Sequence, residues 1–299
     1  MTHPRPRTVL ITGASVGLGL AIARELLANT QFHLILTARA QSMARFAEQG
    51  LVEGPRVWLR ALEVTSAQER EAVIAEIEQR FGALDVLINN AGIAYRCVVE
   101  HVDSDERQAQ MDVNFLAPME LIRRVLPAMR AQRSGRILSI SSVGGMMAMP
   151  TMAVYSASKF ALEGSCEALW YEVRPWSIHV TLVQPGFIHS DGFTKVRMTR
   201  ESQFSAQHEE DPYHEHYASM EPFIGRVMQH TPATPESVAR TVRRTICRRR
   251  PPLRVTATWD ALFFSLLRRF MPRTLYHRFL YWKLPNVKKW GWPPGGSPG

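Results

Sequence analysis

The chain has 299 residues, of which 45% are apolar, enough for a sizeable core and too many for a disordered polymer. Its three cysteines lie far apart in the sequence, which excludes a disulfide scaffold and favours a reducing, cytoplasmic compartment. The apolar run at 9–11 is too short for a signal peptide, and no apolar run reaches the length of about 18 residues that predicts a membrane-spanning helix.

The net charge of +9 is unevenly distributed along the chain. Residues 240–289 hold 14 Lys and Arg and one acid, Asp260, whereas the other 249 residues hold 22 bases and 26 acids. The body is therefore mildly acidic and the tail strongly basic. Nucleic acid and a membrane surface are both candidate partners of this tail.

Short β-branched runs alternate with helical patterns along the body. Strands are predicted over residues 8–12, 32–37, 57–64, 84–89, 136–141, 179–183 and 253–257. Helices are predicted over 18–28, 66–81, 113–131 and 155–173, and another begins after an N-cap at Thr234. This alternation indicates an α/β fold with a doubly wound parallel sheet, and ligands are expected beyond the carboxyl ends of the strands. We expect one catalytic domain over 1–258 and a C-terminal extension over 259–299.

A glycine cluster follows the first predicted strand, with Gly13, Gly17 and Gly19 in seven residues. Glycines permit a tight turn and let backbone amides approach a pyrophosphate at a helix N-terminus, although an ordinary strand-to-helix turn is the alternative. The second strand ends in Thr37-Ala38-Arg39, without the carboxylate that would bind the ribose of NAD. Arg39 suits the 2′-phosphate of NADP, unless it is simply a solvated surface residue.

A second motif carries candidate acid–base chemistry. The sequence Tyr155-Ser-Ala-Ser-Lys159 opens a predicted helix, and this spacing puts the phenol and the ammonium on one face. A nearby cation lowers the pKa of a phenol, so Tyr155 could exchange a proton with a substrate near neutral pH. Ser142, at the end of the fifth predicted strand, could donate to a substrate carbonyl as charge develops on its oxygen.

Six motifs in order resemble the short-chain dehydrogenase/reductase superfamily over about residues 7–190. They are Thr12-Gly13-x-x-x-Gly17-x-Gly19, Asn89-Asn-Ala-Gly92, Asn114, Ser142, Tyr155-x-x-x-Lys159 and Pro185-Gly186. The resemblance implies a single-domain, Rossmann-type fold and hydride transfer between NAD(P) and a carbonyl/alcohol pair. It also implies that Tyr155 is the acid/base, that Lys159 modulates the pKa of Tyr155, and that Ser142 orients the substrate. Asn114 would lie in a kink of its helix and hold a water of the proton relay.

The glycine cluster, Arg39 and the resemblance together give a set of expected cofactor-binding residues. They are Gly13, Ser15, Gly17, Leu18, Gly19, Thr37, Arg39, Glu63, Val64, Asn90, Ala91, Gly92, Tyr155, Lys159, Pro185, Gly186, Ile188 and Ser190. Two positions depart from the family pattern. Glu63 stands where the family usually has Asp, and Val16 stands where NADP enzymes often have a base, so the 2′-phosphate rests on Arg39 and on hydroxyls such as those of Thr37 and Ser15.

The stretches at 142–150 and 155–164 look like the branch that holds 17β-hydroxysteroid dehydrogenase type 1 and the photoreceptor retinol dehydrogenase. That resemblance implies NADP(H) and an apolar steroid-, retinoid- or lipid-like ketone or aldehyde, interconverted with its alcohol. Met147 and Met149 could form a mouldable substrate wall with Ser142 and Tyr155, or could simply fill the core. The alternatives are a catalytically silent nucleotide-binding scaffold and a nucleotide-sugar epimerase or dehydratase, which the glycine spacing and chain length fit less well.

Residues 191–230 have mixed charges and four histidines, and the family places its substrate lid here. The pair His214-x-His216 lacks a third ligand at suitable spacing, so we expect a solvated, mobile lid and no metal.

Residues 259–292 hold ten of the 27 aromatic residues of the chain, interleaved with Lys and Arg. Such a segment suits an anionic bilayer surface and predicts a peripheral membrane enzyme, while packing of the rings on the body is the alternative. Nucleic acid is disfavoured, because nothing in the body resembles a nucleic-acid module. The family also allows a homodimer through the helices near 113–131 and 155–173.

Overall fold

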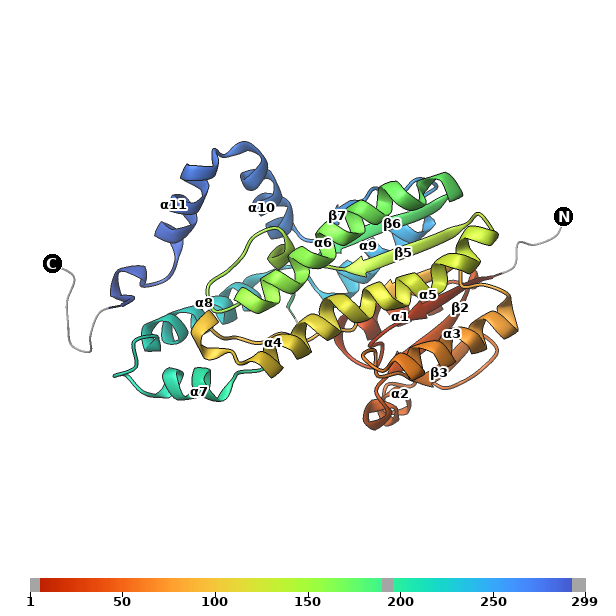
Figure 1. Cartoon of the computed structure of the whole chain (residues 1–299), viewed down its shortest axis with the longest axis horizontal. Coiled ribbons are helices and arrows are strands. Elements are labelled where there is room, and N and C mark those ends of the chain that lie inside the picture. Colours follow the sequence, from red (N-terminus) through yellow and green to blue (C-terminus); the bar gives the residue numbers. More distant parts are fainter. Residues whose placement is uncertain (1–5, 190–195, 292–299) are drawn as a thin grey trace.

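The computed structural model describes residues 6–189 and 196–291. Its centre is a seven-stranded sheet in the order β3-β2-β1-β4-β5-β6-β7, and every neighbouring pair is parallel (Figure 1). The strands are β1 (Arg7–Ile11), β2 (Phe32–Ala38), β3 (Val57–Ala61), β4 (Val86–Asn89), β5 (Gly135–Ile140), β6 (Ile178–Gln184) and β7 (Arg254–Thr256). The predicted doubly wound sheet is confirmed, because helical crossovers carry the chain between parallel neighbours.

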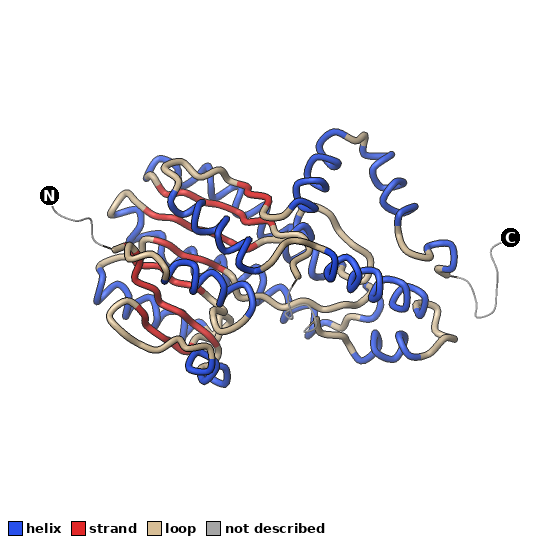
Figure 2. The backbone as a smooth tube through the Cα atoms, turned by 180° about the vertical axis from the view of Figure 1, so that it is seen from behind, coloured by secondary structure: helices blue, strands red, loops and turns tan. Residues whose placement is uncertain are grey.

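Helices cover both faces of the sheet, as the view from behind also shows (Figure 2). On one face α1 (Gly17–Leu27) and α9 (Pro235–Cys247) pack on alternate strand residues such as Val9 and Ile11. On the other face α3 (Ala67–Phe81), α5 (Ala117–Ala131) and α6 (Ala153–Val173) pack on the intervening ones, such as Leu10 and Leu87. The five inner strands, β2, β1, β4, β5 and β6, are buried on both faces, which explains their continuous apolar runs.

Several predicted boundaries need correction. The strand predicted over 57–64 ends at Ala61, and residues 62–65 form the loop before α3, whose N-cap is Ser66. The helix predicted over 113–131 is the end of a longer assembly: α4 (Ser104–Met111), a π-helical turn (Asp112–Leu116) and α5. The polar sequence of α4 hid its start, although Asp103 and Glu106 form a capping box, which is a recognisable start motif. The short helix α2 (Ala44–Glu48) was also not predicted.

The region expected to be a solvated lid contains two well-packed helices, α7 (Arg200–Gln207) and α8 (His214–His230). Tyr217, Met220 and Ile224 of α8 are buried, and the Tyr217 hydroxyl accepts a hydrogen bond from the amide of Val98 at 3.0 Å. The spacing of these apolar residues is helical, so the pattern was present beneath the charges. The solvated description is therefore wrong for α8, while residues 191–195 lie outside the described part of the chain.

The last described segment, residues 259–291, contains α10 (Trp259–Phe270) and α11 (Arg273–Lys283), and we call it the C-terminal arm. It extends from the end of the sheet where α8 also lies (Figure 1). Inner side chains of the arm pack on Met146 and Met149, and Leu284 and Trp290 pack against α8. Within the described residues, no helix has the length and apolar character needed to cross a membrane.

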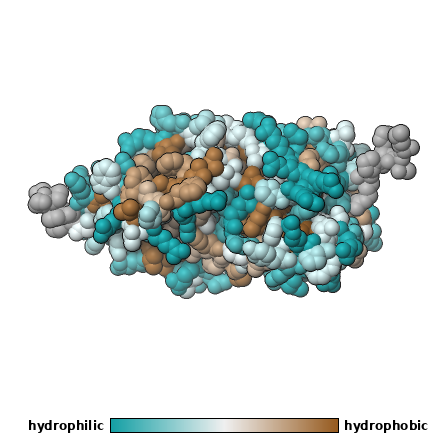
Figure 3. Space-filling view, turned by 90° about the horizontal axis from the view of Figure 1, so that it is seen from above, coloured by the Kyte–Doolittle hydropathy of each residue, from teal (hydrophilic) through white to brown (hydrophobic). Residues whose placement is uncertain are grey.

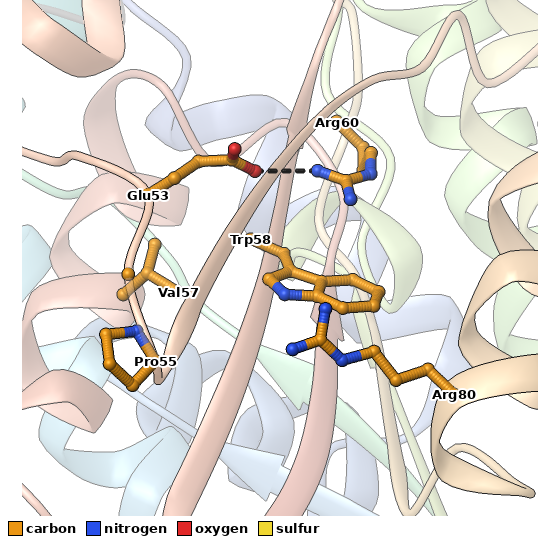
Figure 4. Close-up of a pocket in the computed structure, with 7 residues that line it drawn as sticks. Glu53, Pro55, Val57, Trp58, Arg60 and Arg80 are labelled. Carbon is orange, nitrogen blue, oxygen red and sulfur yellow. Dashed lines mark hydrogen bonds and ion pairs between the residues drawn. The ribbon is translucent and has the colours of Figure 1, made fainter.

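A surface depression lies beside β3, at the amino ends of the strands and far along the sheet from β6. The Arg80 guanidinium lies 4.1 Å over the Trp58 ring, and Arg60 forms an ion pair with Glu53 at 2.7 Å (Figure 4). The charged groups are thus already paired or stacked. None of the residues predicted to be functional lines this depression.

Candidate active site

The turn between β1 and α1 forms a cradle of backbone atoms. Gly13 and Gly17 have positive φ angles of 65° and 56°, which side chains with a Cβ rarely adopt. A Cβ at Gly19 would overlap the carbonyl of Gly13 and lie 2.5 Å from the Asn90 amide nitrogen. The N-cap of α1, Val16, has no side chain that caps the helix, so its first amides are available to an anion. The residues present therefore fit a pyrophosphate group.

Residues after β4 hold this cradle in place. The Asn90 side-chain amide donates to the carbonyls of Thr12 and Gly13, at 2.9 and 3.1 Å. The Thr12 hydroxyl accepts from the amides of Asn90 and Ala91, at 2.9 and 3.0 Å. Gly92 leaves space beside Asn114 and Lys159, where an added Cβ would lie 3.2 Å from the Asn114 side-chain oxygen.

One cation, Arg39, directly follows β2, the strand that pairs with β1. Arg39 is exposed and makes no ion pair with any described residue. Thr37, in contrast, is fully buried, and its hydroxyl donates to the carbonyl of Ile11 at 3.1 Å. The predicted role of the Thr37 hydroxyl in phosphate binding is therefore not supported, because this hydroxyl is buried and bonded to the neighbouring strand β1. Ser15 is buried in the turn itself.

Glu63 lies in the loop after β3. Its carboxylate accepts hydrogen bonds from the backbone amide and the hydroxyl of Thr65, at 3.3 and 3.1 Å. Val64, the next residue, is buried, and its carbonyl accepts from the Arg70 guanidinium at 2.6 Å. The loop that would face an adenine is thus fixed by its own polar contacts.

Three predicted residues meet at the carboxyl end of β5. The Lys159 ammonium lies 5.8 Å from the centroid of the Tyr155 ring and donates to the Ile140 carbonyl at 2.9 Å. Ser142 forms a hydrogen bond with Tyr155, and its oxygen also accepts from the Gly144 amide at 3.0 Å. The packing is close, because a Cβ at Gly144 would lie 2.9 Å from the Tyr155 ring.

Burial dominates the electrostatics of this group. It raises the pKa of the Tyr155 phenol, while the hydrogen bond with Ser142 lowers it. The expectation that the charge of Lys159 leaves the pKa of Tyr155 below its ordinary value is therefore wrong for the protein on its own. Burial also lowers the pKa of Lys159 to about 8, against the opposing charge of Glu163. Glu163 is itself buried, and it accepts from Gln184 and Arg254 at 2.9 and 2.8 Å.

Asn114 lies in the π-helical turn, which confirms the predicted kink in its helix. Its fully buried side chain accepts from the Ile93 amide at 2.9 Å and donates to the Ile93 carbonyl at 2.8 Å. It also donates to the Ser158 hydroxyl, which donates in turn to the Tyr155 carbonyl at 2.7 Å. The sequence reasoning missed Ser158 and Glu163, although both lie within a turn of Lys159.

The loop after β6 is held by the start of the C-terminal arm. The Gly186 amide donates to the Thr258 hydroxyl at 2.9 Å, and the Phe187 amide donates to the Asp260 carboxylate at 2.8 Å. On the other side, the Pro185 carbonyl accepts from the Val143 amide at 2.8 Å, which ties this loop to the segment after Ser142. Thr258 and Asp260 carried no sequence motif, so only the fold reveals them.

The predictions for Ile188 and Ser190 have different outcomes. Ile188 is partly buried and packs against the core beneath α1. Ser190 lies outside the described residues.

The predicted methionine wall lies beneath the C-terminal arm. Met147 is buried in a cluster with Val143 and Tyr276, so the core-filling alternative holds for this residue. Met146 and Met149 are partly exposed and border the same cluster. The arm contributes further apolar side chains: Phe264, Leu267, Met271 and Leu280. Apolar side chains of α10 and α11 therefore pack on the segment that directly follows Ser142.

The lid histidines make separate contacts. A ring nitrogen of His214 lies 3.0 Å from the carbonyl oxygen of Ser205, while His216 packs on the Trp290 ring with 4.3 Å between centroids. Within residues 6–189 and 196–291, no three His, Cys, Asp or Glu side chains gather as metal ligands.

Comparisons with known proteins agree with this architecture. The chain is 38% identical over 193 residues to a 3-ketodihydrosphingosine reductase of Bacteroides thetaiotaomicron, covering 64% of this chain and 68% of that protein. It is 34% identical over 192 residues to 17-beta-hydroxysteroid dehydrogenase type 1 of Homo sapiens, covering 63% and 58%. A crystal structure of a short-chain dehydrogenase from Streptomyces avermitilis matches with a TM-score of 0.77 at 28% identity, over 93% of this chain and 97% of that one.

A metagenomic short-chain oxidoreductase, solved in complex with NADP, matches with a TM-score of 0.64 at 25% identity, over 84% and 96% of the two chains. The family model described as short chain dehydrogenase matches residues 7–201. The chain thus belongs to the short-chain dehydrogenase family, as its motifs and its parallel sheet predicted.

Proposed function

We propose that this protein is an NADP(H)-dependent oxidoreductase that interconverts a hydrophobic ketone or aldehyde and its alcohol. The observation that carries the proposal is the meeting of Tyr155, Ser142 and Lys159 at the carboxyl end of β5, beside the loop at Pro185. Reactive groups at the carboxyl ends of parallel strands lie where this class of fold binds its ligands.

The residues present fit a bound NADP(H). The turn at Gly13–Gly19 and the uncapped start of α1 would hold the pyrophosphate, and the unpaired cation of Arg39 would hold the 2′-phosphate. When bound, the cofactor supplies or accepts the hydride of the reaction. A structural neighbour was crystallised with NADP, which supports this choice.

The side chains would carry the proton chemistry. In the reductive direction the Ser142 hydroxyl donates to the carbonyl oxygen, and the Tyr155 hydroxyl gives that oxygen its proton as the hydride reaches the carbon. Lys159 stabilises the phenolate that remains, and Ser158 fixes the first turn of α6 against Asn114. A π-helical turn shifts carbonyls out of the ordinary helical pairing, and there we place the relay water. Oxidation uses the same groups in reverse.

An apolar substrate follows from the surface around Ser142. The segment directly after Ser142 carries Met146 and Met149, which pack in one apolar cluster with the inner face of the C-terminal arm. Two relatives are named 3-ketodihydrosphingosine reductase and 17-beta-hydroxysteroid dehydrogenase type 1, and these names support a lipid- or steroid-like substrate.

The test is NADPH oxidation with 3-ketodihydrosphingosine, steroid ketones, retinal, fatty aldehydes and 3-oxoacyl compounds. For any substrate turned over, Tyr155→Phe should lower kcat by about 10³-fold, because the proton donor is lost, while the Kd for NADPH stays within a few-fold. Tyr171→Phe is the matched control, since Tyr171 is an exposed tyrosine of the same helix.

Two results would contradict the proposal. Turnover by Tyr155→Phe close to that of the wild type would remove the assigned acid/base. NADPH binding without turnover of any carbonyl in the panel would favour the catalytically silent alternative.

A further inference from the structure

The outer face of α10 exposes an unusual apolar stripe. Trp259, Phe263, Leu266 and Phe270 are spaced by four, three and four residues, which places them on one side of the helix. Their exposed fractions are 79%, 54%, 46% and 74%. Single exposed apolar side chains are common on soluble proteins, but a continuous stripe on one helix marks an interaction surface.

The stripe is not the face that attaches the helix to the body. Phe264 and Leu267 lie on another side of α10 and, with Met271 directly after the helix, pack towards Met146 and Met149. The start of the helix is fixed separately by Asp260, which binds the Phe187 amide. Since the inner face already anchors α10, the outer stripe is free for a partner.

The second helix of the arm continues this surface. Leu275, Tyr281 and Trp282 of α11 are exposed, whereas Tyr276 and Leu280 turn inward. Viewed from above, hydrophobic side chains gather over the half of the molecule that carries the arm, with polar groups between them (Figure 3).

Cations surround these exposed rings. All seven Lys and Arg side chains between 268 and 289 are exposed: Arg268, Arg269, Arg273, Arg278, Lys283, Lys288 and Lys289. Within the described part of the chain, none of them forms an ion pair. Lys283 lies 4.4 Å over the Trp282 ring, and Arg268 lies 5.2 Å over Phe160 of the body.

We propose that the outer face of α10 and α11 docks the protein on an anionic lipid bilayer. Exposed Trp, Phe and Leu at helical spacing would enter the boundary between headgroups and acyl chains, and the unpaired cations would bind lipid phosphates and carboxylates. An anionic bilayer fits this surface better than a folded protein partner does. The arm carries aromatic rings and cations, and its one acid, Asp260, is bonded to the Phe187 amide within the protein.

Docking would also place the site at the membrane. The inner face of the arm packs on Met146 and Met149 of the segment after Ser142, so an apolar substrate that leaves the bilayer would reach the site beside the arm. This second step rests on the proposed function, whereas the docking itself does not.

The test is flotation of the full chain with vesicles of phosphatidylcholine plus phosphatidylserine, and with vesicles of phosphatidylcholine alone. The wild type should float with the mixed vesicles and lose at least about tenfold in partition coefficient without the anionic lipid. Phe263→Ser combined with Phe270→Ser should lower binding to mixed vesicles by at least about tenfold, because the inserting rings are lost. Deletion of the arm is a poorer test, since it also removes Asp260.

Matched controls distinguish binding through the outer face of the arm from nonspecific binding through any exposed ring or cation. Tyr171→Ser with Phe204→Ser removes two equally exposed rings outside the arm and should leave flotation unchanged. Arg273→Glu with Arg278→Glu should weaken binding, while Arg240→Glu with Arg249→Glu changes net charge equally at exposed sites outside the arm and should have a smaller effect.

The docking proposal would be overturned if the wild type did not float, or if the Tyr171→Ser, Phe204→Ser control lost as much vesicle binding as the Phe263→Ser, Phe270→Ser variant. It would also be overturned if sedimentation showed that the free protein self-associates and that Phe263→Ser with Phe270→Ser abolishes this association. Activity is measured separately. If the ring variant retains turnover of a short, water-soluble carbonyl but loses turnover of a vesicle-borne one, delivery from the membrane is supported. Absence of turnover with both substrates in the wild type would contradict the proposed function and leave the flotation result standing.

Discussion

The carboxylate of Asp260 accepts a hydrogen bond from the backbone amide of Phe187 at 2.8 Å, across 73 residues of sequence. Asp260 also lies so close to Gly186 that a Cβ there would overlap its side chain. The first turn of the C-terminal arm therefore sets the position of the loop that follows β6, which the proposed function places along the nicotinamide.

We expect Asp260→Ala to lower the stability of the protein and to weaken NADPH binding. The partly buried Phe187 amide loses its acceptor, and the cost should lie at or below the value of about 1–3 kcal/mol for a fully buried unsatisfied donor. Asp260→Asn keeps a carbonyl oxygen and should lose less of both. Chemical denaturation and the Kd for NADPH measure the two effects. Identical behaviour of the Ala and Asn variants would show that the hydrogen bond does not position the loop.

Gly144→Ala should reduce turnover, because its Cβ would lie 2.9 Å from the Tyr155 ring and must displace that ring or the loop. The expected loss of kcat is about tenfold or more, since small misplacements of reacting groups are costly. Gly164→Ala is the control: Gly164 lies in α6, and a Cβ there would meet nothing within 4 Å. That variant should gain about 0.5–1 kcal/mol in unfolding free energy with unchanged kcat. Equal kcat in both variants would contradict the close packing of Tyr155.

Arg39→Ala should raise KM for NADPH by about 10- to 100-fold and leave KM for NADH nearly unchanged, because only NADPH carries the phosphate that the guanidinium would bind. Arg249→Ala is a suitable control, since Arg249 is exposed in the loop before β7, at the opposite end of the strands. Steady-state kinetics with both cofactors measure the preference. An equal change in the KM values for NADPH and NADH would show that Arg39 does not determine the preference for NADPH.

Burial of Lys159 predicts a pH dependence of stability. The pKa of Lys159 falls from 10.5 to about 8, so between these values the unfolded chain binds a proton that the folded chain does not. Stability should therefore rise with pH across this window, by up to about 3 kcal/mol relative to Lys159→Met. Urea denaturation of both proteins at several pH values measures the difference.

A variant of the neighbouring carboxylate tests the same prediction. Glu163 raises the pKa of Lys159 in the folded protein, so Glu163→Gln should extend the lower end of the window to lower pH and leave its upper end unchanged. A stability difference between wild type and Lys159→Met that stays flat, or falls as pH rises, would contradict the prediction.

Local patterns were enough to predict the sheet and most of the candidate site. The strand at β1, the glycines after it and the spacing of Tyr155 and Lys159 are all encoded within short stretches. The kink at Asn114 followed from the family resemblance and is present as a π-helical turn. These features were predictable because backbone geometry and helical spacing depend mainly on near neighbours.

Other features were wrongly predicted or missed because they depend on partners far along the chain. Thr37 lost its expected role when its hydroxyl paired with Ile11 of the neighbouring strand. The direction of the Tyr155 pKa shift was missed because burial of the phenol, which no spacing reveals, raises that pKa. The charges around α8 hid a face whose burial depends on contacts such as that of Tyr217 with Val98.

The basic, aromatic tail shows most clearly which features the sequence predicts and which depend on the folded structure. The sequence by itself determined that cations and rings are concentrated there, and it left membrane binding and packing on the body as alternatives. Only the tertiary structure decided which side of α10 is buried and which is exposed. The inner side chains pack against Met146 and Met149, and the outer stripe remains exposed. The physical reason is that helical periodicity sorts apolar residues onto two faces, while the surface present in the folded body selects the face that is buried.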